Sequence, residues 1–239
     1  MKKLLFSAMA LFAAMSLVSC DPSEIVDSIS GNVSLTISCE GVDNHYTDGQ
    51  TIDFSSSVTD IITDSALAEM VFLGANINLT ESNASIAAPY LGFVVADTVI
   101  GTYQIDNVMT PENIATFAPQ SLLTNLSGNN VFLLIASDTS FYLAKAGSIT
   151  LSDYPSIVIE PANGTFNNVQ CYYVTDSKMA YIKNLLNDAN AGDPAAIATL
   201  ATLNIDELFP TVTFNGTFSS RRMIVQTLLD NLDSETPQE

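Results

Sequence analysis

Short segments in which apolar and polar residues alternate dominate the chain after its first thirty residues. Residues 33–37 and 51–54 alternate in this way, as half-buried strands do. Asp48-Gly49 lies between them and favours a hairpin connection. Residues 91–99 form a longer, mainly apolar run rich in Val and Phe, which is consistent with a strand buried on both faces. The pattern therefore predicts a sheet of short strands.

More strands are expected along the rest of the chain, with turn residues such as Gly147 and Pro155 between them. They are predicted at residues 70–73, 75–79, 101–105, 131–135, 141–143, 148–151 and 157–159. A helix of one or two turns is predicted to begin at Pro111. Many short strands at this spacing are typical of an antiparallel sandwich or barrel. We therefore predict a mainly β fold, an antiparallel β-sandwich or barrel-like body.

One segment, residues 177–203, departs from this alternation and changes to a period of about 3.6 residues. The apolar side chains that share one helical face are Met179, Ile182, Leu185, Leu186 and Ala189, followed after a break by Ile197, Leu200 and Leu203. Gly192-Asp193-Pro194 supplies the break. We expect a helical hairpin inserted between strands, covering a sheet edge or one end of the body.

The tetrapeptide Asn-Gly-Thr-Phe occurs twice, at residues 163–166 and 215–218. Asn-Gly favours a type I′ hairpin turn, because both residues tolerate positive φ. We therefore expect two similar sheet corners at these positions. Residues 221–232 fit either a closing helix or a last strand, and the sequence leaves both open.

The N-terminal residues MKKLLFSAMALFAAMSLVSC have the form of a secretory signal, with a basic start and a short apolar run. The last four residues resemble the bacterial lipobox, in which the cysteine carries the lipid and becomes the new N-terminus. This resemblance implies that Cys20 is the lipid-attachment site. The expected organisation is a signal peptide at 1–19, a tether at 20–30, a single β-rich domain at 31–233 and a flexible tail at 234–239.

The chain resembles the uncharacterised β-rich lipoproteins of Bacteroidota. The lipobox, Gly101-Thr102-Tyr103 closing a strand, and the two late Gly-Thr-Phe pieces carry this resemblance. It implies a fold and a location but no activity. Acidic residues soon after Cys20, at Asp21, Glu24 and Asp27, resemble the surface-export signal of such lipoproteins. We therefore expect an outer-membrane protein, facing the cell surface in preference to the periplasm.

Charge is strongly one-sided, because without Lys2 and Lys3 the formal net charge of −19 becomes −21. Such a chain repels phosphate backbones, which argues against nucleic acid as a partner. Apart from Cys20, the cysteines are Cys39 and Cys171. An exported protein permits a disulfide between them. The alternative is two buried, reduced thiols that pack as small hydrophobes.

Candidate chemistry is sparse in the sequence. His45, the single histidine, lies in a polar turn-like segment, and we expect it to be solvated there. A nucleophile elbow, a phosphate-binding loop and a dinucleotide fingerprint are all missing. One histidine and two distant cysteines do not make a zinc site. Asp43, Asn44 and Asp48 come nearest to a calcium loop but lack its spacing, so we expect no metal and no cofactor.

Three functions are compatible with these sequence features. The first is a non-enzymatic, lipid-anchored binding or assembly protein with an unidentified protein or glycan ligand. The second is a fimbrial subunit of the pilin type, and the third is a glycan-active enzyme using paired carboxylates. The tyrosines that could stack on sugars, but whose ordinary role is packing in the sheet, are Tyr90, Tyr103, Tyr142, Tyr172 and Tyr173.

Overall fold

The computed structural model describes residues 31–54, 57–63, 69–76, 89–109, 129–154 and 161–222. The predicted signal peptide, Cys20 and the predicted tether lie outside these ranges. So do residues 77–79 of the strand predicted at 75–79, the predicted strand at 157–159, the predicted helix at Pro111 and the predicted tail. Of residues 221–232, only Arg221 and Arg222 are described, and they continue a strand.

Ten strands make up the described sheet. They are β1 (Asn32–Ser38), β2 (Thr51–Phe54), β3 (Ser57–Thr63), β4 (Glu69–Asn76), β5 (Tyr90–Val95), β6 (Gly101–Gln104), β7 (Val131–Ser137), β8 (Ser140–Asp153), β9 (Pro161–Thr175) and β10 (Thr211–Arg222). Three helices lie between β9 and β10, namely α5 (Asp176–Asn190), α6 (Pro194–Thr202) and α7 (Ile205–Leu208). The prediction of a mainly β fold with an inserted helical hairpin is confirmed.

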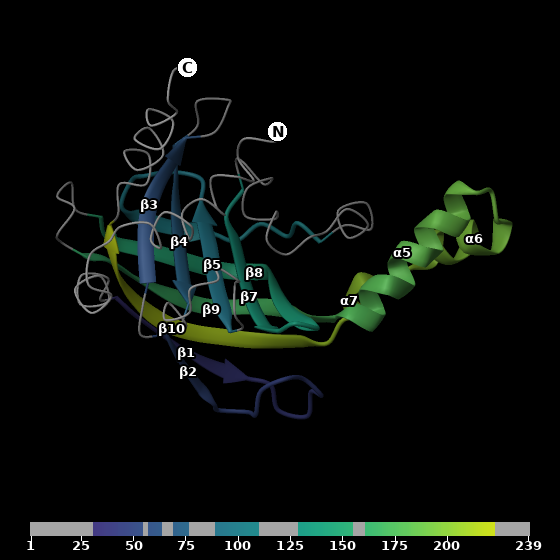
Figure 1. Ribbon diagram of the computed structural model, residues 1–239, viewed down its shortest axis with the longest axis horizontal. Helices are drawn as coiled ribbons and strands as arrows, with labels where there is room; N and C mark the ends of the chain where they lie inside the picture. Colours follow the sequence, from purple (N-terminus) through teal and green to yellow (C-terminus); the bar gives the residue numbers. More distant parts are fainter. Residues whose placement is uncertain are drawn as a thin grey trace, which may run out of the picture.

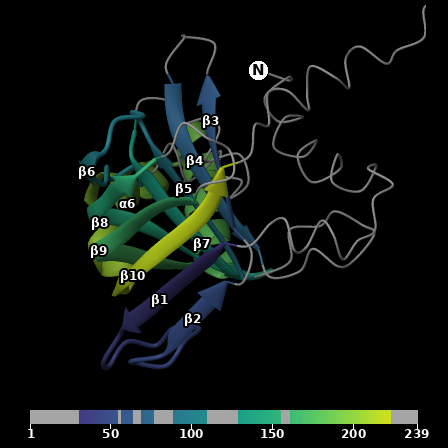
Figure 2. The same cartoon turned by 90° about the vertical axis from the view of Figure 1, so that its left-hand side faces the viewer.

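The sheet curls into a half-barrel whose two parts cross each other (Figure 1). In one part, the long strands β8, β9 and β10 lie side by side, with β6 beside β8 and β1 and β2 beyond β10 (Figure 2). The other part is formed by β3, β4, β5 and β7, which pair antiparallel in that order. A short parallel pairing of β10 with β3 joins the two parts on one side, and β7 with β8 joins them on the other.

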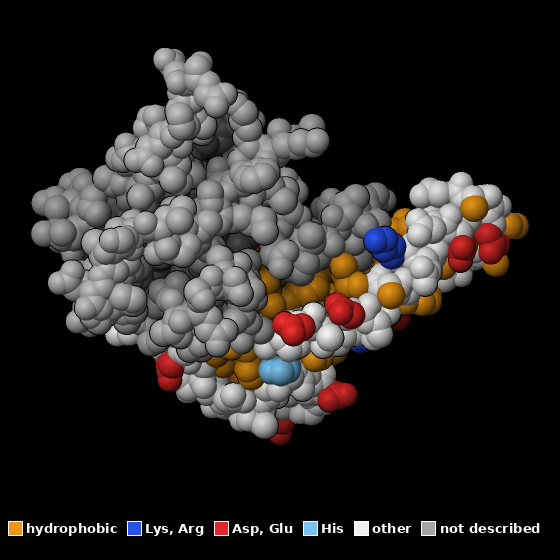
Figure 3. Space-filling view, in the orientation of Figure 1, with side chains coloured by type: hydrophobic (Ala, Val, Ile, Leu, Met, Phe, Trp, Pro, Cys, Tyr) orange, Lys and Arg blue, Asp and Glu red, His pale blue; other side chains and the backbone are white. Residues whose placement is uncertain are grey.

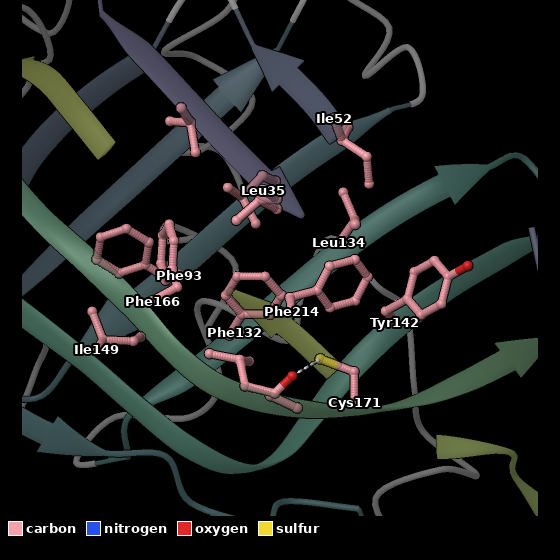
Figure 4. Close-up of a cluster of buried hydrophobic side chains, with 14 of the residues drawn as sticks. Leu35, Ile52, Phe93, Phe132, Leu134, Tyr142, Ile149, Phe166, Cys171 and Phe214 are labelled. Carbon is pink, nitrogen blue, oxygen red and sulfur yellow. Dashed lines mark hydrogen bonds between the residues drawn. The ribbon is translucent and has the colours of Figure 1, made fainter. Parts of the chain in front are cut away.

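The main core fills the space between the two parts of the sheet. Phe166 lies near its centre, with its ring centroid 5.3 Å from those of both Phe93 and Phe132. These rings and Phe214 are fully buried (Figure 4). They come from β5, β7, β9 and β10, so one cluster of aromatic rings connects both parts of the half-barrel. Truncating such a ring costs about 3–5 kcal/mol.

A second apolar cluster covers the opposite face of β5, β7, β8 and β9. Its members include Val131 and Leu133, which alternate along β7 with Phe132 of the main core. Helix α5 contributes Ile182, and the residue after α7, Phe209, completes the cover. Every residue of β5 is buried. This confirms the prediction of a strand buried on both faces for residues 91–95 of the predicted segment 91–99. Val99 is exposed and lies beyond the strand.

The predicted corners at the two Asn-Gly-Thr-Phe pieces are wrong, because β9 and β10 run through them. Neither Gly164 nor Gly216 has the positive φ of a type I′ turn. A Cβ at Gly164 would lie 2.5 Å from Phe218 Cε1, and one at Gly216 would lie 2.8 Å from Leu35 Cδ2. Glycine is required here because neighbouring strands approach closely, not because the chain turns.

The predicted break at Gly147 is also wrong, since residues 141–143 and 148–151 belong to one strand, β8. Gly147 has a φ of +108°, and the register with β9 shifts on both sides of Ala146. Such a bulge bends a strand without ending it. It lets β8 pair with β7 at its beginning and with β6 at its end.

The helical hairpin projects from the body and does not lie along it (Figure 1). Ile182 of α5 is buried, as predicted, and anchors the base of the hairpin on the second cluster. Ile197 was predicted on the inner face of the second helix, but its side chain is 51% exposed. Ala196 faces inward in its place. The prediction that the hairpin covers the body therefore applies only to its base.

Candidate functional site

The described residues place one lysine, one carboxylate and one phenol together at the base of the hairpin. Lys145 of β8 lies with its Nζ 2.5 Å from Oδ1 of Asp206, a residue of α7. The Tyr172 hydroxyl donates to the same oxygen at 3.0 Å. Lys145 Nζ also lies 4.7 Å from the centroid of the Tyr172 ring, within the range of a cation–π interaction. We call these three residues the hairpin-base cluster.

The electrostatics of the hairpin-base cluster favour the ionised form of Asp206. Hydrogen bonds from Lys145 and then from Tyr172 lower the pKa of Asp206. Burial, and then the hydrogen bond to Asp206, raises the pKa of Tyr172. The carboxylate therefore stays ionised and the phenol stays protonated at neutral pH. A general acid requires the opposite, a carboxyl group whose pKa is raised.

A second lysine side chain forms a hydrogen bond at the end of α7. Lys178 of α5 donates to the Leu208 carbonyl oxygen at 2.7 Å, and its Nζ lies 5.8 Å from the Phe209 ring centroid. Lysine side chains thus bind α7 from both the sheet and α5. The arrangement fits a structural role, holding the base of the hairpin in a fixed direction.

The loop between β1 and β2 carries the other polar group of interest. Asn44 Oδ1 accepts hydrogen bonds from the Tyr142 hydroxyl at 2.9 Å and from the backbone N–H of Tyr46 at 3.0 Å. Tyr46 stacks on Tyr142, with 5.7 Å between ring centroids. Burial raises the pKa of Tyr46 to about 12, and it raises that of Tyr142 as well. Both phenols therefore stay protonated, and they connect the loop to β8.

His45 lies in this loop and its side chain is exposed (Figure 3). Its backbone N–H donates to the Tyr142 hydroxyl at 3.2 Å. The prediction of a solvated loop histidine is confirmed. Asp48 and Asn44, which came nearest to a calcium loop, instead accept hydrogen bonds from backbone N–H groups.

Cys39 and Cys171 are both buried in the main core and are not bridged. Cys39 follows Ser38, which lies opposite Thr213 of β10, whereas Cys171 lies opposite Val212 on the other side of the same strand. Two strand spacings amount to about 10 Å, and a disulfide requires Cα atoms within about 7 Å. The structure corrects the disulfide alternative in favour of two buried thiols. Burial raises the pKa of Cys171.

The tyrosines considered as sugar platforms have the ordinary packing role. Tyr90, Tyr142 and Tyr172 are buried, and Tyr103 and Tyr173 pack against the main core. The hairpin-base cluster was not predicted from the sequence. The available signal was Lys145 itself, one of the chain's seven basic residues, within the apolar segment Leu143–Ala146.

No model of a protein family matches the chain, and no curated protein or solved structure does so either. Among the described residues, no three histidine, cysteine, aspartate or glutamate side chains come together as metal ligands would. In the same part of the chain, no helix is long and apolar enough to cross a membrane.

Proposed function

We propose that the protein is a lipid-anchored cell-envelope protein with a non-enzymatic binding or assembly role, facing the cell surface. The lipobox-like segment that ends at Cys20 supports the anchor. The observation that carries the role is the position of the hairpin relative to the start of the domain. Strand β1 begins at Asn32, opposite Ser219 near the end of β10. The hairpin leaves the sheet at the other end, between Thr175 and Thr211.

These positions direct the hairpin away from the anchored end of the domain (Figure 1). From Ser219 back to Thr211, β10 covers about 27 Å, and the 15 residues of α5 add about 22 Å. The segment from Cys20 to Asn32 can span at most about 40 Å. A domain held close to the membrane at one end would thus present the hairpin at the far end.

The composition of the hairpin suits contact with another molecule. Helix α6 has no ionisable side chain, although the chain as a whole is strongly acidic. Tyr181 of α5 is 46% exposed and Ile197 of α6 is 51% exposed. Apolar side chains are visible along the hairpin (Figure 3). Contiguous exposed apolar surface can mark a contact site, and we place such a surface on the hairpin.

The test is metabolic labelling with an alkyne fatty acid, followed by membrane fractionation of the full-length protein and a Cys20→Ser variant. The wild type should carry the label and sediment with membranes, whereas Cys20→Ser should carry none and leave the membrane fraction. Ser19→Ala is the matched control, because it changes the neighbouring small residue and keeps the cysteine. A Cys20→Ser protein that kept both label and membrane association would rule out this anchor.

A fimbrial subunit is the second candidate, supported by the two edges of the sheet. Within the described residues, β2 pairs only with β1 and β6 pairs only with β8, so each leaves backbone donors and acceptors along one side. Strand exchange at such an edge predicts oligomers of the exported protein. Sedimentation velocity of the purified full-length protein in detergent would show monomers if this candidate is wrong.

A further inference from the structure

Two rows of polar residues, with one charge between them, cross the outward face of six neighbouring strands: β2, β1, β10, β9, β8 and β6. One row of paired residues crosses all six strands in continuous register: Asp53, Ser34, Thr217, Thr165, Thr150 and Thr102. Five of these side chains bear hydroxyl groups, and Asp53 at the edge is the single charge. The six strands lie side by side in Figure 2, and the row is about 24 Å long.

A second row lies two residues along each strand and contains no charged side chain. Its members are Thr51, Thr36, Asn215, Asn167, Ser148 and Gln104, with the register between the two asparagines shifted by a bulge in β9 and β10. Most of these side chains are exposed. We call the two rows together the polar face. Asp53 is the one acidic residue in these two rows, although the chain has a formal net charge of −19.

Hydrogen bonds between strands hold part of the polar face in a fixed arrangement. The Thr102 and Thr150 hydroxyls lie 2.9 Å apart. Asn167 Nδ2 donates to the Thr165 hydroxyl at 2.9 Å and to the Thr150 hydroxyl at 3.4 Å. Side chains ordered before binding lose less conformational entropy when a ligand arrives.

We infer that the polar face binds a neutral polysaccharide, an inference that deepens the proposed binding role and rests on it. Hydroxyl and amide groups both donate and accept hydrogen bonds, as the hydroxyls of a sugar polymer do. The two rows lack the cations that a nucleic acid requires and the apolar or basic side chains that a lipid surface requires. They also lack the aromatic residues, methionine and arginine that dominate protein interfaces.

The regular spacing of the polar face also suits a ligand built from repeating sugar units. Neighbouring positions within a row are about 4.8 Å apart, and the rows are about 6.8 Å apart. A single hydrogen bond contributes little net affinity, but a polymer can contact many equivalent positions at once. Several membrane-anchored copies bound to one polymer would add avidity.

The test is affinity electrophoresis of the purified full-length protein, in detergent, through native gels that contain dextran, starch, galactomannan or mixed-linkage β-glucan. At least one of these polymers should retard the wild type. A Thr165→Val, Thr217→Val double variant keeps side-chain shape and strand propensity, and its dissociation constant should rise about fivefold or more. Thr98→Val, Thr139→Val lies in the β5–β6 and β7–β8 connections, outside both rows and outside the hairpin. It is the matched control and should bind within twofold of wild type. Thermal melts of all three proteins confirm folding.

Two results would overturn the inference: no retardation of the wild type by any of the four polymers, or equal retardation of the wild type and the Thr165→Val, Thr217→Val variant. Sedimentation velocity of the same samples examines a protein partner. Self-association of the wild type that this variant abolishes, without polymer binding, would identify a second copy as the partner and refute the polysaccharide. Polymer binding is measured with purified protein, so a negative result does not contradict the lipid anchor. A negative result in the anchor test likewise does not contradict polymer binding.

Discussion

Replacing Gly164 with alanine tests the packing of the three long strands. The new Cβ would lie 2.5 Å from Phe218 Cε1 and closer still to the backbone carbonyl oxygen of Thr150. The Phe218 ring is buried beside Phe93 and Phe166, and the Thr150 carbonyl belongs to the neighbouring strand. The sheet itself must therefore shift to accept one methyl group.

The expected cost follows from two opposing effects. Overpacking a core costs about 1–3 kcal/mol or more, and the lower entropy of the unfolded alanine chain returns about 0.4–1 kcal/mol. Because the sheet itself must shift, the upper end of the overpacking cost applies, and the net loss for Gly164→Ala is about 2–2.6 kcal/mol. This corresponds to about 4–10 °C in Tm for a domain of this size. Thermal unfolding of the purified full-length protein in detergent, followed by circular dichroism, measures it.

Gly101→Ala is the matched control within the same sheet. The nearest atoms to its added Cβ, on the Tyr103 side chain, lie 4.0 Å away, which is an ordinary van der Waals contact. This variant should melt at the wild-type temperature or slightly above it. If Gly164→Ala melted as high as Gly101→Ala, the close approach of β8, β9 and β10 at this point would be refuted.

Three further predictions concern burial and charge. Ile182→Ala should lower the free energy of unfolding by about 2–5 kcal/mol, whereas Ile197→Ala should change it by less than about 0.5 kcal/mol; equal losses in urea titrations would contradict the packing of the hairpin base. Because folding lowers the pKa of Asp206 from its ordinary value of 3.8, the ionised carboxylate stabilises the fold at pH values above 3.8. This stabilisation is lost as the pH falls through the lowered pKa. The wild type should therefore have a higher Tm than Asp206→Asn at pH 7 and the same Tm at acidic pH. A difference in Tm that grew toward low pH would contradict the stabilising role of the carboxylate. Cys39 and Cys171 should react with a thiol reagent only in denaturant, and faster reaction after reduction would reveal a disulfide.

The sequence predicted the elements whose signal is local. Alternation fixed the strands at 33–37 and 51–54, and the change of period located the hairpin within a residue or two of α5 and α6. Both depend on neighbours in the chain, and the alternation of buried residues along β1 follows the pattern closely.

The errors have a common physical origin in contacts between distant residues. Asn163-Gly164 has the composition of a turn, but its glycine is required because Phe218 and Thr150 approach it from other strands. Ile197 and Ala196 are adjacent in one short helix, and only the position of α5 decides which of them is covered. Periodicity within a single helix cannot supply that position.

The candidate sites could not be predicted from the sequence for the same reason. Lys145 and Asp206 are 61 positions apart in the sequence. They belong to no common sequence motif and come together only because α7 packs near β8. The two cysteines could be weighed as a disulfide, but only the pairing register shows that β10 lies between them. The polar face likewise appears only when six strands are placed in register.

Presentation of the hairpin at the cell surface by an anchor on Cys20 is the central claim, and labelling of intact cells tests it most directly. An Ile197→Cys variant places a thiol at an exposed position of α6, while Cys39 and Cys171 are 6% and 0% exposed and serve as internal controls. A membrane-impermeant maleimide should label Ile197→Cys on intact cells and leave the wild type unlabelled. Labelling of Ile197→Cys that appeared only after the cells were lysed would contradict surface presentation.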